Sequence, residues 1–179
     1  MNATPPLDRR SRTAFRGCLL GGAVGDALGA PVEFESIAEI RARHGPSGIT
    51  DLVDGAWPAG SITDDTQMTL FSAEALIRGK HRFLERGIAS AAAMARLSYL
   101  RWLATQGEQV AEDVRTGWLV NVPGLHARRA PRNTCLAALA AGGRGRPDHP
   151  VNGSKGCGGV MRVAPVGLAL EEREGRMRG

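Results

Sequence analysis

The sequence SITDDTQMTL occupies residues 61–70, where an irregular stretch gives way to an apolar helical pattern. The four residues before it, WPAG at 57–60, are typical of a turn, because proline fixes its own φ and glycine frees the next step. Apolar residues then recur at helical spacing from Met68 onward, and Gly79 stands where a helix-ending glycine is expected. The pattern therefore predicts a helix between this stretch and Gly79.

Thr63 or Asp64 is the predicted N-cap of this helix, with Gln67 as the partner in a capping box. A cap needs one side-chain oxygen, whereas positions 63–65 supply a hydroxyl and two carboxylates. Two interpretations stay open. Asp64 and Asp65 can converge on a hard cation, Mg²⁺ or Mn²⁺, which prefers oxygen ligands. Alternatively, the second aspartate of a surface helix complements the helix dipole; the three residues alone favour this second interpretation.

The composition predicts one helical domain. A chain of 179 residues is long enough to bury a core. Aromatic residues make up only 4%, β-branched residues are few and alanine is frequent, which favours helices over strands. The formal net charge is +5, but the basic residues do not cluster with the aromatic residues that a nucleic-acid surface needs. We therefore expect no nucleic-acid partner.

The cysteines and the apolar runs predict a soluble cytoplasmic protein. Cys18, Cys135 and Cys157 are odd in number and lack CxxC spacing, so neither a disulfide framework nor a thiolate zinc site is expected. The N-terminus has no apolar signal-peptide core, and the apolar run 18–32 is too short to span a bilayer. No membrane partner is expected. Residues 1–8 are predicted to be a flexible leader to a domain at 9–179.

A second helix is predicted from about Arg9 to Leu28, and glycines form a stripe without side chains along it. The stripe consists of Gly17, Gly21, Gly25 and Gly29. Glycine costs about 1 kcal/mol at each helix-interior position. Four such positions in register predict a buried helix, closely approached by another backbone or by a ligand.

Two acids accompany this helix. Asp26 lies between two of the glycines, and an acid in an apolar helix needs a partner or a cation. A cap or a salt bridge to an arginine is the simpler interpretation. Glu33 ends the unusual stretch GDALGAPVE at 25–33, and its simpler interpretation is a solvated loop carboxylate.

A glycine-rich stretch, NGSKGCGGVMRVAP, occupies residues 152–165. Such a stretch before a helix exposes backbone N–H groups, which favour anions. Ser154 and Lys155 add a hydroxyl and a cation, so the stretch suits a phosphate or a diphosphate. It is not a Walker A loop, because no Gly-Lys-Ser/Thr ends it. Cys157 as a nucleophile is the less favoured interpretation, since no histidine stands beside it in the sequence.

Three stretches together resemble the ADP-ribosylglycohydrolase family, which includes the dinitrogenase-reductase-activating glycohydrolases. They are RGCLLGGAVGDALGAPVE at 16–33, GSITDDTQM at 60–68 and GCGGVMRVAP at 156–165. They follow the family order and span nearly the whole chain. The resemblance implies a compact all-α fold with two Mg²⁺ or Mn²⁺ ions in a central cleft. It also implies hydrolysis of the bond between ADP-ribose and a modified side chain, commonly arginine, of a protein or a small substrate.

By position, the resemblance assigns roles to particular residues. Thr63, Asp64 and Asp65 match metal ligands, and Glu33 matches a carboxylate beside the metals that binds them or orients water. Glu33, Asp64 and Asp65 are thus the catalytic candidates. Asp26 also matches, with a structural role. The candidates for holding the diphosphate or the adjoining ribose are Ser154, Lys155, Gly156, Cys157, Gly158 and Gly159.

The chemistry agrees with this assignment. Cleavage at a ribose carbon passes through an oxocarbenium-like state, which carboxylates normally manage. Two metal ions can hold the ribose hydroxyls and lower the pKa of the attacking water.

The sequence departs from the family at its end. Family members carry an Asp-x-Asp-Ser/Thr stretch near a later C-terminus, whereas this sequence has no Asp-x-Asp, and Asp148 is its last aspartate. We therefore expect a domain without its C-terminal part, with only the first ligand cluster and with exposed apolar surface. Three hypotheses remain: the hydrolase, a non-catalytic remnant that binds ADP-ribose or a single metal ion weakly, and a helical scaffold.

Overall fold

The computed structural model describes residues 11–111, 114, 116–131, 133–142 and 148–170. Its α-helices are α1 (Arg12–Gly29), α2 (Ile37–His44), α3 (Asp64–Arg86), α4 (Ala91–Thr105), α5 (Asn133–Ala140) and α6 (Ala164–Ala169). Its 3₁₀-helices are η1 (Ala30–Val32), η2 (Leu119–Asn121), η3 (Pro123–His126) and η4 (Cys157–Arg162). No β-strand occurs in these ranges, which confirms the all-α prediction. The predicted leader at 1–8 lies outside the described residues.

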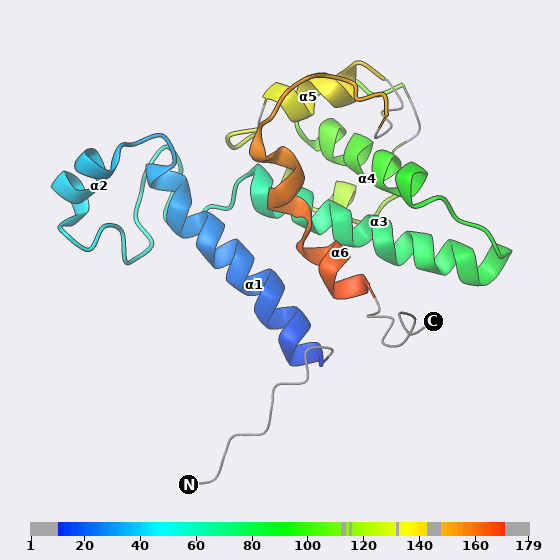
Figure 1. Ribbon diagram of the computed structural model, residues 1–179, viewed down its shortest axis with the longest axis horizontal. Helices are drawn as coiled ribbons and strands as arrows, with labels where there is room; N and C mark the ends of the chain where they lie inside the picture. The colour runs from blue at the N-terminus through cyan, green and yellow to red at the C-terminus, as the bar shows by residue number, and fades with distance from the viewer. Residues whose placement is uncertain (1–10, 112–113, 115, 132, 143–147, 171–179) are drawn as a thin grey trace, which may run out of the picture.

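Helix α3 is the centre of the arrangement (Figure 1). Helix α4 packs along it, and η4 and α6 also contact it. Helix α1 contacts α3 and α6 and leads through η1 toward α2 at the edge of the molecule. The segments that carry the first and third sequence motifs therefore lie against α3, whose start carries the second.

The main core lies between α3 and α4. Met68 and Phe71 of α3 and Trp102 of α4 are all 0% exposed. Residues from other elements complete the cluster, which consists of Met68, Phe71, Leu100, Trp102, Leu103, Leu125, Cys135 and Leu136. Burying a large aromatic or aliphatic side chain contributes about 1.5–3 kcal/mol each, so this seam fixes the direction of α3.

The predicted end of α3 at Gly79 is wrong. The helix continues to Arg86, and Gly87 ends it in the left-handed conformation at φ 70°. Gly79 instead faces α4, where a β-carbon would lie 3.4 Å from Cγ of Met94. A glycine that admits a neighbouring helix therefore resembles a helix-ending glycine in the sequence.

The predicted capping box at the start of α3 is also wrong in its second residue. Gln67 turns inward: its amide oxygen accepts from Nε1 of Trp102 at 3.0 Å and Nε2 of Gln106 at 3.1 Å. Its amide nitrogen donates to the carbonyl of Ala127 at 2.8 Å. Because Gln67 is 0% exposed, these bonds offset the cost of burying its amide. The start of α2 carries a complete capping box between Ser36 and Glu39, as a serine followed three residues later by a glutamate predicts.

The prediction of a buried, closely packed α1 is wrong. Only Ala27 of α1 is buried, and a β-carbon on any glycine of the stripe would meet nothing within 4 Å. Leu20 and Val24 are 59% and 53% exposed. Helix α1 packs mainly against α3, η1 and α6, and apart from Ala27 its residues are partly buried or exposed.

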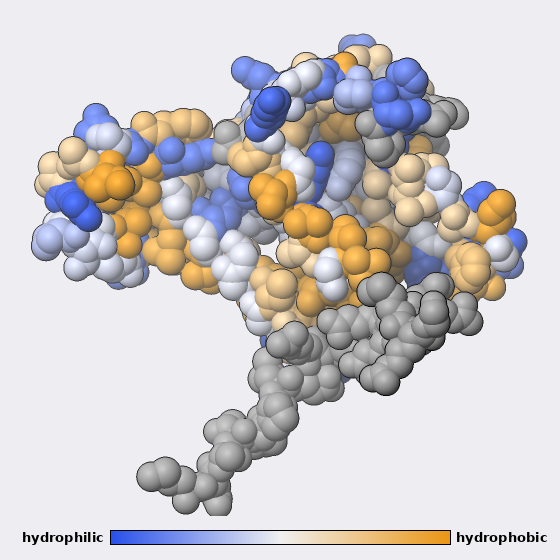
Figure 2. All heavy atoms as spheres, viewed as in Figure 1, coloured by the Kyte–Doolittle hydropathy of each residue, from blue (hydrophilic) through white to orange (hydrophobic). Residues whose placement is uncertain are grey.

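The prediction of exposed apolar surface is confirmed. Figure 2 shows apolar side chains gathered over η4 and α6 on the viewed face. Val160 is 71% exposed, and Val163, Val166 and Leu170 are exposed as well.

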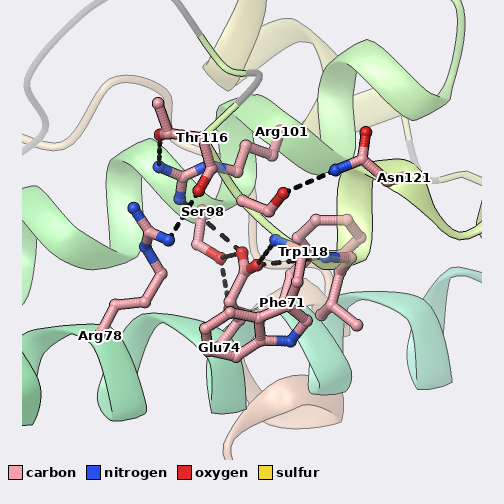
Figure 3. A network of polar contacts seen from close by, with 10 residues as sticks. Phe71, Glu74, Arg78, Ser98, Arg101, Thr116, Trp118 and Asn121 are labelled. Carbon is pink, nitrogen blue, oxygen red and sulfur yellow. Dashed lines mark hydrogen bonds and ion pairs between the residues drawn. The ribbon is translucent and has the colours of Figure 1, made fainter.

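A buried ion pair fastens the segment 116–121 to α3 and α4 (Figure 3). Oε1 of Glu74 accepts from the backbone N–H groups of Trp118 at 2.8 Å and Leu119 at 3.2 Å. Oε2 lies 3.7 Å from Nη1 of Arg101 and accepts from the Ser98 hydroxyl at 3.1 Å. Burial lowers the pKa of Arg101, with a further lowering by Arg78, while Glu74 opposes the shift. The carboxylate of Glu74 is therefore the common partner of the backbone N–H groups, the Ser98 hydroxyl and the Arg101 guanidinium in this cluster.

Replacing Glu74 is expected to destabilise the fold. Glu74→Ala leaves Arg101 buried without its carboxylate and should lower the free energy of unfolding by about 3–5 kcal/mol. The matched control is Glu85→Ala on the same helix, whose side chain is 60% exposed, with a change within about 0.5 kcal/mol. Urea denaturation followed by circular dichroism measures both. Equal stability of the two variants would contradict this account of the core.

Candidate active site

The carboxylate of Asp26 on α1 holds the first turn of α3. Its Oδ1 accepts from Oγ1 of Thr63 at 2.6 Å, and its Oδ2 accepts from the backbone N–H of Thr63 at 2.9 Å. Oδ2 also accepts from the N–H of Thr66 at 3.2 Å and from its hydroxyl at 2.5 Å. The free N–H groups of a helix start and the helix dipole both favour an anion there. Asp26 therefore caps α3 from a different helix.

The N-cap residue of α3 is Thr63, so of the two predicted alternatives, Thr63 and Asp64, the structure has the first. Its hydroxyl accepts from the N–H of Asp65 at 3.4 Å and lies 3.3 Å from Oδ2 of the same residue. Thr63 is 1% exposed. The two threonine hydroxyls and the aspartates thus form one connected cluster of oxygen atoms at the helix start.

Asp64 and Asp65 lie on different sides of the helix start. Asp64 is 1% exposed, and its backbone N–H donates to the carbonyl of Arg129 at 3.2 Å. Asp65 is partly exposed and faces α1. Consecutive helical residues point about 100° apart, which separates the two carboxylates.

A hollow of about 390 Å³ opens between η1 and the start of α3. It is lined by Asp26, Gly29, Ala30, Val32, Glu33, Thr63 and Asp65. The structure therefore brings Glu33 together with Thr63 and Asp65, although at least 30 residues separate Glu33 from the other two in the sequence. Asp64 does not line this hollow.

A second hollow, of about 330 Å³, lies between α1 and α3. Asp26 and Asp65 line both hollows, and Met161 and Ala164 line the second one. The hydroxyl of Thr69 lies 3.1 Å from the carbonyl oxygen of Met161, to which it donates. The second hollow therefore connects the acidic helix start to the later part of the glycine-rich stretch, at Met161 and Ala164.

The glycine-rich stretch differs in form from the expectation. Cys157 to Arg162 form the 3₁₀-helix η4, and the short helix α6 follows. Ser154, Lys155, Gly156, Cys157 and Gly159 are exposed, whereas Gly158 is buried. The hydroxyl of Ser154 lies 3.0 Å from that of Thr134 on α5. Within the described part of the chain, none of these six residues lines either hollow.

The segment 127–129 is a part of the site that sequence reasoning missed. The carbonyl of Arg129 accepts from the backbone N–H of Asp64. Nη1 of the same arginine donates to the carbonyl of Ile62 at 3.2 Å. Ala127 accepts from Gln67. These contacts are mostly through backbone carbonyls, which leave no signature of residue type in the sequence. Ala130, directly after them, has a φ of 45°, which is uncommon for a residue with a side chain.

A scan of known protein families matches the ADP-ribosylglycohydrolase family model over residues 5–178. The chain belongs to the ADP-ribosylglycohydrolase family. An uncharacterised protein of Archaeoglobus fulgidus is 32% identical in an alignment of 165 positions that covers 86% of this chain and 42% of that protein. An ADP-ribosyl-[dinitrogen reductase] glycohydrolase of Rhodospirillum rubrum is 47% identical in an alignment of 57 positions that covers 30% of this chain and 19% of that protein.

The chain thus spans less than half the length of these curated relatives. No solved structure matches it. None of the helices in the described ranges has the length and apolar character needed to cross a membrane.

The family is generally metal-dependent, so the oxygen cluster can be compared with what a divalent ion needs. Asp65, Glu33 and Thr63 offer carboxylate and hydroxyl oxygens around one hollow, which is the donor chemistry of Mg²⁺ or Mn²⁺. In the part of the chain that the structure describes, no three His, Cys, Asp or Glu side chains group closely enough to form a metal site alone. The ligand type therefore fits such an ion, with water or substrate oxygens needed to complete its shell.

Removing the carboxylate of Asp26 should loosen the start of α3. Asp26→Ala leaves the N–H groups of Thr63 and Thr66 without their acceptor and should cost about 2–3 kcal/mol of unfolding free energy. Asp51→Ala is the matched control, because Asp51 is exposed and, among the described residues, its side chain accepts only from the N–H of its neighbour Leu52. Thermal and urea unfolding provide the measurement. If both variants unfold alike, Asp26 does not hold the helix.

Proposed function

We propose that this chain is a hydrolase of the ADP-ribosylglycohydrolase type, which removes ADP-ribose from a modified side chain with Mg²⁺ or Mn²⁺. The arginine-linked modification is the substrate that we favour. The observation that carries the proposal is that Glu33, Thr63 and Asp65 line one hollow. Asp26 lines it too and accepts a hydrogen bond from the hydroxyl of Thr63. The link of this hollow to η4 through the second hollow supports a substrate that extends from the carboxylates toward the glycine-rich stretch.

The reaction breaks the bond between the anomeric carbon of the ribose and the guanidine nitrogen of the modified arginine. The oxygen of a water molecule bonds to the anomeric carbon, and one of its protons goes to the departing nitrogen. Positive charge develops on the ribose as the bond breaks, and nearby carboxylates stabilise such charge. A bound divalent ion would supply Lewis acidity toward the ribose hydroxyls and a lower pKa for bound water.

The chain's own residues have distinct tasks in this proposal. Asp65 and Thr63 hold the ion, and Glu33, exposed at the rim, orients the attacking water. Asp64, which is buried, shapes the turn that presents Asp65. Asp26 keeps the hydroxyl of Thr63 at a fixed place through its 2.6 Å hydrogen bond.

The exposed residues 154–157 receive the diphosphate in this proposal. They offer the ammonium group of Lys155, the hydroxyl of Ser154 and backbone N–H groups. An anion with several oxygen atoms suits such donors. The substrate is an ADP-ribosylated protein or a small ADP-ribosyl compound. Cys18, Cys135 and Cys157 form no disulfide among the described residues, which supports a reducing compartment, and we place the reaction in the cytoplasm.

Activity is expected to need both a divalent ion and Asp65. The purified chain should release ADP-ribose from ADP-ribosyl-arginine with Mg²⁺ or Mn²⁺, and EDTA should abolish the release. Asp65→Ala and Asp64→Ala should both be inactive, with Asp65→Ala retaining the stability of the wild type better because Asp65 is less buried. Asp51→Ala is the active control. Chromatography of released ADP-ribose measures the rate, and turnover that persists in EDTA would rule this mechanism out.

A second candidate is a non-catalytic chain that binds ADP-ribose or a single metal ion weakly. It is favoured by the described ranges, in which no three His, Cys, Asp or Glu side chains group closely enough to hold a metal ion. Isothermal titration calorimetry separates the two candidates. The weak binder should take up at most one Mn²⁺ per chain and release no ADP-ribose. Two bound ions, or any turnover by the purified chain, would eliminate it.

A further inference from the structure

The 3₁₀-helix η4 is fastened to three other helices. The first contact is at Gly158, where a β-carbon would lie only 2.6 Å from Sγ of Cys135 on α5. Glycine is therefore required here for close approach, and the thiol of Cys135, 6% exposed, lies beneath this point of η4. A cysteine covered in this way reports whether η4 is in place.

The second contact joins η4 directly to the acidic turn of α3. The hydroxyl of Thr69 lies 2.8 Å from the carbonyl oxygen of Asp65 and 3.1 Å from that of Met161. The hydroxyl of Thr69 thus donates both to Asp65, which lines both hollows, and to Met161 of η4. A shift of η4 along α3 would break this shared bond.

The third contact is a stack between Arg162 and Tyr99. The guanidinium carbon of Arg162 lies 4.4 Å from the centre of the Tyr99 ring on α4. Its Nη1 lies 3.4 Å from the sulfur of Met68 on α3. The ring itself is held, because its hydroxyl lies 2.7 Å from that of Ser72. A partly buried cation over an aromatic face is a directional contact, and the planar guanidinium fits it better than an ammonium does.

We propose that Arg162 and Tyr99 are positioning residues, whose stack holds η4 against α3 so that the glycine-rich stretch is ready to bind the diphosphate. Neither residue touches the reacting atoms; both act through η4. This inference rests on the proposed function for the identity of the ligand, ADP-ribose. The energetic reason is preorganisation, because a turn already fixed loses less freedom when the diphosphate binds.

The first arm of the test measures whether η4 stays fastened, with no reference to ADP-ribose. Alkylation of each cysteine by iodoacetamide is followed by mass spectrometry, with the exposed Cys18 and Cys157 as internal references. Arg162→Met and Tyr99→Leu should raise the alkylation rate of Cys135 about tenfold or more, as local opening becomes easier. Tyr99→Phe keeps the ring and should leave the rate within about twofold.

The second arm measures the dissociation constants of ADP-ribose and of Mn²⁺ by calorimetry. Arg162→Met and Tyr99→Leu should each weaken the binding of ADP-ribose about tenfold and leave the binding of Mn²⁺ unchanged. A purely structural loss would weaken the binding of both. The double variant should be no weaker than the worse single variant, because both changes remove the same stack. The dissociation constant of ADP-ribose for Arg162→Lys should fall between those of the wild type and Arg162→Met. If Tyr99→Leu does not fold, the comparison of Arg162→Lys with Arg162→Met tests the positioning role.

The outcomes separate this inference from the proposed function. Unchanged alkylation of Cys135 in Arg162→Met, or additive losses of ADP-ribose affinity in the double variant, would overturn the positioning role. If the wild-type chain binds no ADP-ribose, the proposed function is contradicted. The alkylation of Cys135 then decides alone whether the stack fastens η4.

Discussion

Four hydrogen bonds converge on the carboxylate of Asp26, and the arrangement of the site depends on them. They join the end of α1 to the first turn of α3, although the two segments are separated by nearly forty residues. A helix start is a concentration of unpaired N–H groups with a positive dipole end. A carboxylate from another helix satisfies these groups and at the same time lines both hollows. The same contact therefore contributes both stability and geometry.

Helix α3 divides its first turns between the core and the site. Gln67 and Met68 point into the seam with α4, where both are 0% exposed, while Asp65 and Thr69 face the hollows. The helical repeat makes this division possible, because residues one apart point to different sides. The core then fixes the rotation of α3, and the rotation of α3 fixes where Asp65 points. The buried Glu74 cluster further along α3 anchors the same helix from the far side.

The sequence allowed a good prediction of the helices and of which stretches carry the chemistry. The Ser36–Glu39 capping box and the N-cap at Thr63 follow from local rules, and the structure has both. Long-range uses of a residue were less predictable. Gly79 admits α4 and does not end its helix, and Gln67 binds Trp102 and not its own helix start. Nothing local distinguishes those uses.

The structure brings some of the predicted site residues together, and the roles of these residues stay a prediction. Glu33, Thr63 and Asp65 do line one hollow, whereas residues 154–159 line neither of the two hollows beside Asp65. The backbone carbonyls of Ala127 and Arg129 support the turn without any residue-type signal. Diffraction from crystals soaked in Mn²⁺, recorded at the manganese edge, tests the central claim most directly. The account predicts an anomalous peak in the hollow of Asp26, Glu33 and Thr63, about 2.1 Å from a carboxylate oxygen of Asp65. Manganese bound at another place, with this hollow holding only water, would contradict it.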